Sequence, residues 1–258
     1  MTFSNNTILI SGGSSGIGLG FAKKFLELGN QVIITSRSKE KLDSLVNSHP
    51  NLYGYIVDVT NVESVYSLKE QVLLDFPNLN VLFNSAGIMK SFDLFDDNVN
   101  PQMLHSEINT NLIGTINMTK VFLSHLIKQN TPLIINVSSG LSYVSSAAHP
   151  IYSGTKSAVH MFTDAVREQA IYKGYNHLTV MELVPPLVAE TNLEEHAPID
   201  APNNMKLSDL IDQGIEAIQQ KVIRLDAGYA KEMHRQALKD SDTFTHTIAQ
   251  VMLPRYFS

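Results

Sequence analysis

Short runs of apolar residues alternate with longer helical patterns along most of this chain. Several of the runs are continuously apolar, such as Ile8-Leu9-Ile10 and Val32-Ile33-Ile34. Strands that are buried on both faces of a parallel sheet have this character, whereas one-sided antiparallel strands alternate apolar with polar residues. Because parallel strands are joined by right-handed helical crossovers, the alternation predicts an α/β fold with a doubly wound sheet. We expect about seven mainly parallel strands, flanked by helices on both faces.

The expected elements extend over nearly the whole chain. The expected strands are residues 7–11, 31–35, 54–58, 80–84, 133–137, 178–184 and 222–225. The expected helices are residues 17–29, 39–48, 62–76, 101–128, 151–173 and 207–220. Because the 258 residues contain no internal repeat and no linker, we predict a single domain over residues 1–258.

The segment 189–205 interrupts this alternation of strands and helices. It is acidic and polar, it contains Pro198 and Pro202, and it is long for a connection in a compact domain. We interpret it as part of a variable lid over residues 189–220 on the substrate side, with a merely solvated loop as the alternative. Residues 226–258 are predicted to form a C-terminal helical extension.

Composition narrows the classes of function. A net charge of −6 and the lack of a run of Lys or Arg argue against nucleic acid or a membrane surface as a partner. The absence of cysteine excludes disulfides and thiol catalysis, and the nine histidines show no paired ligand spacing, so we expect no metal. The polar N-terminus does not resemble a signal peptide, and no apolar stretch approaches the roughly 20 residues that span a bilayer. We therefore expect a cytoplasmic protein.

A glycine-rich turn follows the first expected strand and opens the first expected helix. Its glycines permit a tight turn and a close approach of the backbone, and the helix N-terminus offers free N–H groups to a pyrophosphate. A Gly/Ser-rich turn without a ligand is the alternative. The spacing is G-x-x-x-G-x-G, and the candidate dinucleotide-binding residues are Gly12, Ser14, Ser15, Gly16, Ile17 and Gly18.

The end of the second expected strand bears on which dinucleotide binds. An acidic side chain there would hold the ribose 2′-hydroxyl of NAD, but this chain has Ser36 followed by Arg37. An arginine can pair with a 2′-phosphate, which a carboxylate would repel. The sequence therefore favours NADP(H), with NAD(H) as the second choice. The alternative is that Arg37 belongs to an ordinary solvated helix start.

Polar and small residues also follow the third and fourth expected strands. In open α/β sheets, ligands bind outside the carboxyl ends of the strands. Asp58 would accept a hydrogen bond from the adenine amine, and Asn84 and Gly87 would shape the floor beneath the nicotinamide. Ordinary turn chemistry is the alternative, since Asn, Asp and Gly are common at turns. The candidate residues here are Asp58, Val59, Asn84, Ala86 and Gly87.

Tyr152 and Lys156 lie four residues apart in an expected helix, downstream of the serine pair Ser138-Ser139. The spacing places phenol and ammonium on one helix face. A phenol beside a fixed positive charge is a usable proton donor near neutral pH, because the charge stabilises the phenolate. Hydride transfer to a carbonyl needs such an acid. The plain alternatives are a helix-start aromatic, a surface lysine and loop serines.

Together these residues resemble the short-chain dehydrogenase/reductase family. The resemblance extends from Thr7 to Thr191 and includes the glycine turn, the Asn84–Gly87 stretch, Asn111 and the Tyr152-x-x-x-Lys156 motif. Within the family, the stretches 7–42 and 134–156 are similar to DltE-type bacterial oxidoreductases. The resemblance to the family implies a Rossmann-like fold and NADP(H)-dependent interconversion of a carbonyl and an alcohol on a small molecule. The alternatives are a nucleotide-binding sensor or scaffold without turnover, and an epimerase or dehydratase on the same fold.

The resemblance also implies residue roles. Tyr152 would be the acid/base, and Lys156 would bind the nicotinamide ribose and lower the phenol pKa. Ser139, thirteen residues before Tyr152, would orient the substrate, with Ser138 as the competing candidate. Asn111 would hold a structural water and complete the proton relay.

One loop departs from the family pattern. After the sixth strand, Pro186 stands where the family has glycine, and Thr191 comes one place late. Contacts from Pro185 and Val188 to the cofactor are expected, although proline fixes φ and lacks an N–H. By resemblance we expect a homodimer or homotetramer. Met118, Phe122, Met161 and Phe162 are candidate interface residues, with core packing as the alternative.

Overall fold

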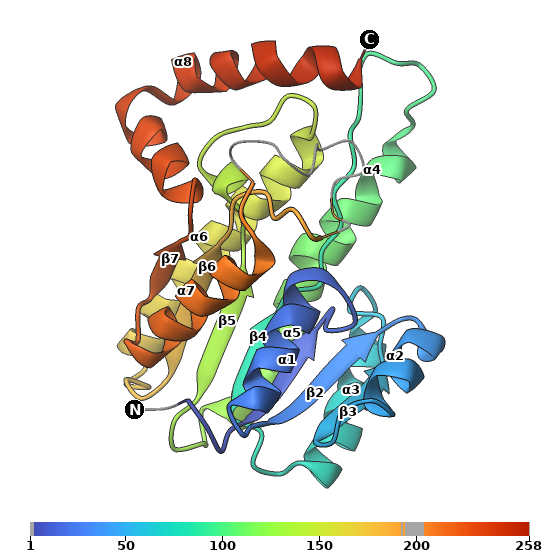
Figure 1. Cartoon of the computed structure of the whole chain (residues 1–258), viewed down its shortest axis with the longest axis vertical. Helices are drawn as coiled ribbons and strands as arrows, with labels where there is room; N and C mark the ends of the chain where they lie inside the picture. Colours follow the sequence, from blue (N-terminus) through green and yellow to red (C-terminus); the bar gives the residue numbers. More distant parts are fainter. Residues whose placement is uncertain (1–2, 192, 194–203, 258) are drawn as a thin grey trace.

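Strands of the described chain form a single parallel sheet. The computed structural model describes residues 3–191, 193 and 204–257. Within these residues seven strands pair in the order β3-β2-β1-β4-β5-β6-β7, every neighbour parallel (Figure 1). The strands are β1 (Thr7–Ser11), β2 (Gln31–Ser36), β3 (Leu52–Ile56), β4 (Val81–Asn84), β5 (Leu133–Val137), β6 (Thr179–Val184) and β7 (Arg224–Asp226). The predicted Rossmann-like doubly wound fold and single domain are confirmed.

Helices cover both faces of the sheet. One face carries α1, α2 and α7, and the other carries α3, α5 and α6. The helical segments are α1 (Gly16–Glu27), α2 (Lys39–Val46), α3 (Val62–Asp75), α4 (Pro101–Glu107), η1 (Ile108–Ile113), α5 (Gly114–Leu126), η2 (Gly140–Ser142), α6 (Pro150–Tyr172), α7 (Leu207–Gln219) and α8 (Ala230–Tyr256).

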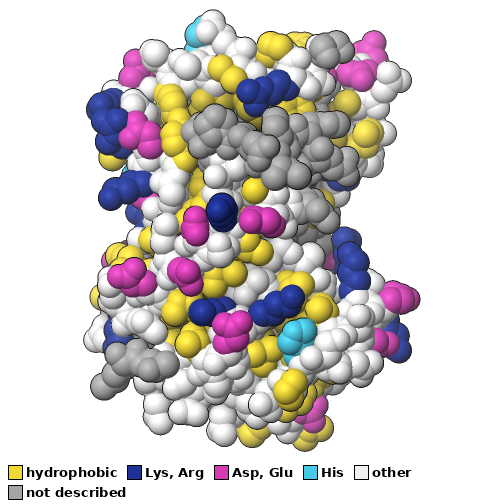
Figure 2. Space-filling view, viewed as in Figure 1, with side chains coloured by type: hydrophobic (Ala, Val, Ile, Leu, Met, Phe, Trp, Pro, Cys, Tyr) yellow, Lys and Arg dark blue, Asp and Glu magenta, His cyan; other side chains and the backbone are white. Residues whose placement is uncertain are grey.

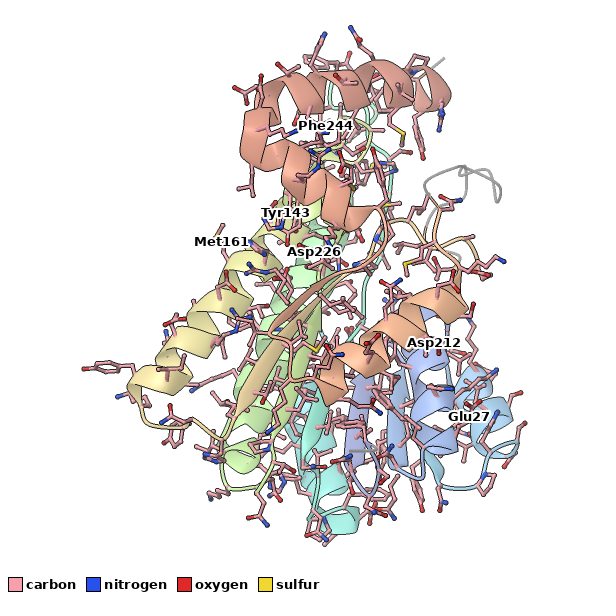
Figure 3. All side chains as sticks on the ribbon, turned by 60° about the vertical axis from the view of Figure 1, so that its left-hand side comes forward. Glu27, Tyr143, Met161, Asp212, Asp226 and Phe244 are labelled. Atoms are coloured by element: carbon pink, nitrogen blue, oxygen red, sulfur yellow. The ribbon has the colours of Figure 1, made fainter. Side chains whose placement is uncertain are left out.

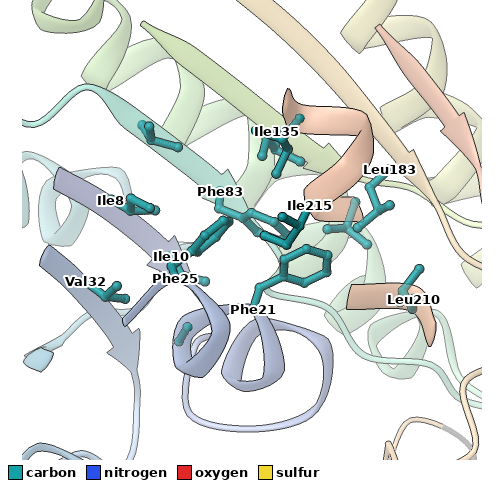
Figure 4. Close-up of a cluster of buried hydrophobic side chains, with 14 of the residues drawn as sticks. Ile8, Ile10, Phe21, Phe25, Val32, Phe83, Ile135, Leu183, Leu210 and Ile215 are labelled. Atoms are coloured by element: carbon teal, nitrogen blue, oxygen red, sulfur yellow. The ribbon is translucent and has the colours of Figure 1, made fainter. Parts of the chain in front are cut away.

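Two apolar cores, one on each face, hold the layers together. Successive residues of a strand point to opposite faces, so Ile8 and Ile10 enter one core and Leu9 enters the other. On the first face, Phe21 of α1 packs against Phe83 of β4 with ring centroids 4.9 Å apart (Figure 4). Each fully buried aromatic of this kind contributes roughly 1.5–3 kcal/mol from removal of apolar surface from water.

The strand order reverses between β1 and β4. These strands are neighbours, with Ser11 opposite Asn84, although two strands and three helices separate them in sequence. At such a switch point the chain leaves the two strands toward opposite sides, which opens a crevice outside their carboxyl ends. The glycine-rich turn after β1 and the segment after β4 therefore meet at this crevice.

Most predicted elements match the observed bounds to within one or two residues, and three differ in a way that has a structural cause or alters the element. The third strand begins and ends two residues earlier than expected, because Asp58 turns the chain by accepting hydrogen bonds from Thr60. The predicted helix 101–128 is broken by the π-helical segment η1, and the predicted strand 222–225 is the shorter β7. Met118 and Phe122 lie fully buried in the core, so core packing, the alternative reading for these two, is correct.

The C-terminal segment forms a long bent helix above the carboxyl end of the sheet (Figure 1). The helix α8 bends at Asp240, whose φ of −162° and ψ of 90° are not helical. Of the expected lid, residues 192 and 194–203 lie outside the described residues, and the lid stays a prediction. A bridge pairs Val188, just before the expected lid, with Met205 inside it.

Acidic and basic side chains are interspersed on the face of the molecule seen in Figure 2. Among residues 3–191, 193 and 204–257, no helix combines the length and the apolar character that crossing a membrane requires.

Candidate active site

The glycine-rich turn is packed against the end of β4. Gly12 has a φ of +68°, and a Cβ there would lie 2.7 Å from the Cα of Ala86. A Cβ on Gly18 would lie 2.6 Å from the carbonyl oxygen of Gly12. Only glycine satisfies the close approach at both positions, so the turn and the first turn of α1 are held tightly together.

The N-terminus of α1 is open to an anion. Its N-cap, Ser15, makes no side-chain capping hydrogen bond, and no acidic residue lies in the first turn. By contrast, Ser38, Asn61 and Asn100 cap α2, α3 and α4 with their own side chains. The first N–H groups of a helix have no partner within it, so those of α1 are available to a phosphate. The cleft is lined here by Ser14, Ser15, Gly16 and Ile17. This donor set fits the pyrophosphate of a dinucleotide.

The end of β2 presents a hydroxyl and a cation. Ser14 donates a hydrogen bond from its Oγ to the Oγ of Ser36 at 3.0 Å, which ties the glycine turn to β2. Arg37 is exposed, and its guanidinium forms no ion pair with any described residue. The neighbouring Lys39, in contrast, pairs with Asp43 at 3.0 Å. Arg37 is therefore the cation best placed to meet an anion beside the turn.

Of the residues that follow β3 and β4, some line the cleft and others stabilise the structure around it. Gly87 lines the cleft, and so does Ser85. Asn84 is buried, and its amide donates to Asn136 at 2.8 Å and to Thr119 at 3.0 Å, which links β4 to β5 and α5. Asp58 accepts a hydrogen bond from the N–H of Thr60 and so forms a turn. Val59 packs against Gly114, where an added Cβ would lie 2.6 Å from the Cγ2 of Val59.

Tyr152 and Lys156, the proposed acid/base and its neighbouring cation, lie on one face of α6. Tyr152 and Lys156 are 4% and 5% exposed, and both line the cleft. The Nζ of Lys156 lies 5.5 Å from the centroid of the Tyr152 ring and donates to the carbonyl of Val137 at 2.8 Å. Burial lowers the pKa of Lys156 to about 8. The ammonium is thus desolvated, fixed in place and close to the phenol, where it stabilises a phenolate.

The serine pair separates into two environments. Ser138 donates from its Oγ to the Glu182 carboxylate at 2.5 Å, and Glu182 is fully buried. Burial alone would raise the pKa of Glu182, but hydrogen bonds from His160, Ser138 and Arg224 hold it below its ordinary value. Ser139 caps η2 by accepting from the N–H of Leu141, which leaves its hydroxyl proton for another acceptor. This arrangement favours Ser139 as the serine that meets a substrate.

The loop after Ser139 is anchored on the side away from the cleft. Tyr143 donates from its hydroxyl to Asp226 of β7 at 2.7 Å, and both side chains are labelled in Figure 3. The ring of Tyr143 stacks on His234 of α8 with centroids 4.0 Å apart. A Cβ on Gly140 would lie 2.6 Å from the sulfur of Met233. The start of α8 therefore holds the loop that presents Ser139.

Asn111 lies in the π-helical segment η1, a conformation often found at functional sites. Its side chain is fully buried and pairs with both backbone groups of Ile88: the Nδ2 donates to the Ile88 carbonyl, and the Ile88 N–H donates to the Oδ1, each at 2.9 Å. The Nδ2 also reaches the hydroxyl of Thr155 at 3.1 Å. Asn111 thus connects the segment after β4 to the helix that carries Lys156.

The structure brings most of the predicted residues to one cleft. Those lining it are Gly12, Ser14, Ser15, Gly16, Ile17, Gly87, Ser139, Tyr152, Lys156, Pro185 and Val188. Those that do not line it are Gly18, Arg37, Asp58, Val59, Asn84, Ala86 and Asn111.

Six further residues line the cleft and are missing from the predicted set: Ser85, Val137, Ser138, Pro186, Thr191 and Leu193. The displaced threonine was visible in the sequence, because it stands one place after the family position. Its hydroxyl donates to the carbonyl of Val188 at 2.9 Å. His149 is buried, and its Nδ1 lies 3.1 Å from the Ser146 hydroxyl, so its ring has a hydrogen-bond partner.

The sequence matches a known family and a known relative. The family model of the short chain dehydrogenases matches residues 6–201. The uncharacterized oxidoreductase DltE of Bacillus subtilis (strain 168) is 38% identical over 195 residues, which cover 76% of each chain.

Solved structures show the same fold. A short chain dehydrogenase from Burkholderia cenocepacia J2315 in complex with NADP superposes with a TM-score of 0.83 at 22% identity, over 96% of this chain and 99% of that one. A short chain dehydrogenase/reductase from Burkholderia phymatum in complex with NAD superposes with a TM-score of 0.75 at 21% identity, over 87% and 89%.

The chain belongs to the short-chain dehydrogenase/reductase family and is an oxidoreductase of that family, similar to the DltE type.

Proposed function

We propose that this protein is an NADP(H)-dependent oxidoreductase that interconverts a carbonyl and an alcohol, with Tyr152 as the acid/base. The observation that carries the proposal is one continuous cleft. It begins at the uncapped N-terminus of α1 and ends at Tyr152, Lys156 and Ser139. A dinucleotide laid along it would place its phosphates at the helix and its ring beside the phenol.

The side chains supply the proton and the charge that carbonyl reduction requires. When bound, NADPH supplies a hydride from its nicotinamide ring. Ser139 donates a hydrogen bond to the substrate oxygen, and Tyr152 donates its proton to the same oxygen as negative charge develops there. The Nζ of Lys156 lies 5.5 Å from the centroid of the Tyr152 ring, and opposite charges about 5–6 Å apart at an effective dielectric near 20 attract by about 3 kcal/mol.

The preference for NADP(H) rests on the end of β2. No carboxylate stands at Ser36, and the guanidinium of Arg37, which pairs with no acidic group among the described residues, follows it. A bidentate contact between arginine and a 2′-phosphate is roughly twice as strong as a neutral hydrogen bond. The neighbours in complex with NADP and with NAD share the fold, and Arg37 is the feature of this chain that selects between the two nucleotides.

A nucleotide titration tests the cofactor assignment. We expect the purified protein to bind NADPH more tightly than NADH, measured by nicotinamide fluorescence. Arg37→Gln should weaken NADPH binding by about 10-fold or more, since a charged hydrogen-bonded pair is worth about 1.5–3 kcal/mol, and leave NADH binding unchanged. Lys39→Gln is the matched control, because Lys39 is engaged with Asp43, and it should bind both nucleotides as the unmodified protein does. Equal losses for NADPH and NADH in Arg37→Gln would refute the 2′-phosphate assignment.

A further inference from the structure

Hydrogen bonds from backbone N–H groups hold the segment that follows β4, beginning with Ser85, whose N–H lies 3.2 Å from both the carbonyl and the hydroxyl oxygen of Ser11. Residues 85–92 have no regular secondary structure, so their position depends on these anchors. In an extended chain, alternate residues point their backbone groups to the same side. The further anchored N–H groups are those of Ala86 on the Ser11 hydroxyl at 3.3 Å, Ile88 on Asn111 at 2.9 Å, Lys90 on the Glu107 carboxyl at 2.9 Å and Phe92 on the Ala148 carbonyl at 3.1 Å.

Two small residues near these anchors face the cleft. Ser85 and Gly87 line it. A Cβ on Gly87 would lie 3.4 Å from the Oδ1 of Asn111 and 3.6 Å from the Nζ of Lys156. The anchors on one side of the segment therefore set how closely its other side approaches Lys156 and a bound dinucleotide.

Glu107 differs from the other anchors because it can titrate. The other acceptors are a hydroxyl, an amide and a backbone carbonyl, none of which changes charge near neutral pH. Glu107 ends α4 and is fully buried. Its Oε1 accepts from Lys90, whereas its Oε2 is buried and has no hydrogen-bond partner among the described residues.

The surroundings of this carboxyl favour its neutral form. Burial raises the pKa of Glu107 to about 7, and Lys90 acts in the opposite direction through its N–H and its charge. Lys90 is exposed, and so is His105, which lies on α4 together with Glu107. The helix α6, which packs against α4, carries the buried Lys156. An ionised carboxylate with a single donor is costly away from water, so loss of the proton acts against the anchored geometry.

We propose that Glu107 is a positioning residue of the cleft: it holds residue 90 while Asn111 holds residue 88, and ionisation of its carboxyl releases this anchor and weakens dinucleotide binding. The proposal rests on the proposed function of the cleft as a dinucleotide site. Glu107 acts through the segment 87–90 and touches neither cofactor nor substrate. A purely structural carboxyl at this position would affect stability without giving nucleotide binding its own pH dependence.

Two variants test the role of Glu107. Glu107→Gln keeps an acceptor for the Lys90 N–H and cannot ionise, so it represents the protonated form. Glu107→Leu removes the acceptor at all pH values. NADPH affinity is measured by fluorescence between pH 5.5 and 9 for both variants and the unmodified protein, with circular dichroism to confirm folding.

At pH 5.5 we expect the unmodified protein and Glu107→Gln to bind NADPH within about twofold of each other. Above pH 8 the unmodified protein should bind at least about threefold more weakly than Glu107→Gln, and a folded Glu107→Leu should bind weakly throughout. Superimposed profiles for the unmodified protein and Glu107→Gln would overturn the proposal, whether or not Glu107→Leu folds. Failure of the unmodified protein to bind NADPH at any pH would instead remove the proposed function itself.

Discussion

Replacing Gly12 by alanine tests whether the glycine turn builds the cofactor site by close backbone approach. The chain offers a matched control at Gly29, which also has a left-handed backbone, with a φ of +82° against +68° at Gly12. A Cβ on Gly29 would meet nothing within 4 Å, whereas a Cβ on Gly12 would lie 2.7 Å from the Cα of Ala86. The two substitutions therefore share the conformational cost and differ in the clash.

The magnitudes follow from these distances. A left-handed backbone costs an L-residue roughly 1–2 kcal/mol, which should be the whole effect of Gly29→Ala. Carbon atoms prefer separations of about 3.5–4.0 Å, so Gly12→Ala must also push the turn away from Ala86 by about 1 Å. Overpacking of this kind costs about 1–3 kcal/mol more, for a total of roughly 2–5 kcal/mol.

Denaturant unfolding and NADPH titration measure the two consequences. Gly12→Ala should lose the larger unfolding free energy and bind NADPH at least about tenfold more weakly, whereas Gly29→Ala should bind NADPH as the unmodified protein does. Equal unfolding free energies for the two variants, or unaltered NADPH binding by Gly12→Ala, would refute the reasoning about the turn.

Two further predictions concern the residues around Tyr152. Ser139→Ala should abolish most turnover with little change in stability. Ser138→Ala should retain turnover and lose about 1–3 kcal/mol of unfolding free energy, because Glu182 loses a buried hydrogen-bond donor. Steady-state rates and denaturant unfolding measure both effects, and the reverse pattern would exchange the roles of the two serines. Burial lowers the pKa of Lys156 from its ordinary 10.5 to about 8, so the folded protein binds fewer protons than the unfolded chain between these values. The penalty for burying the charge is therefore largest below pH 8 and is removed as pH rises to 10.5, by up to about 3 kcal/mol. Lys156→Met should lack this rise when unfolding free energy is measured from pH 7.5 to 10.5, and parallel curves for the two proteins would contradict the shift.

Much of the sheet could be predicted because its strands are short apolar runs between turn residues. The strands 7–11 and 133–137 were predicted with their observed ends, since each run is buried on both faces and is followed by polar or glycine residues. The position of the cleft followed from the glycine turn after β1 together with the residues after β4, because the topology of a doubly wound sheet places these ends side by side.

The features that were missed depend on partners distant in sequence. Nothing local in residues 108–113 marks a π-helix; the segment is held by the pairing of Asn111 with Ile88, 23 residues away. Glu107 and Glu182 read as ordinary charges in a helix and a strand, yet both are fully buried. Glu182 is satisfied by residues up to 44 positions away, which local periodicity does not report.

The proposed reaction takes its proton from Tyr152 and its hydride from NADPH. Its most direct test compares the unmodified protein with Tyr152→Phe, using NADPH oxidation across a panel of carbonyl compounds and NADPH binding by fluorescence. We expect the unmodified protein to consume NADPH with at least one carbonyl, and Tyr152→Phe to bind NADPH normally but consume none. Consumption of NADPH by Tyr152→Phe at the unmodified rate would contradict it.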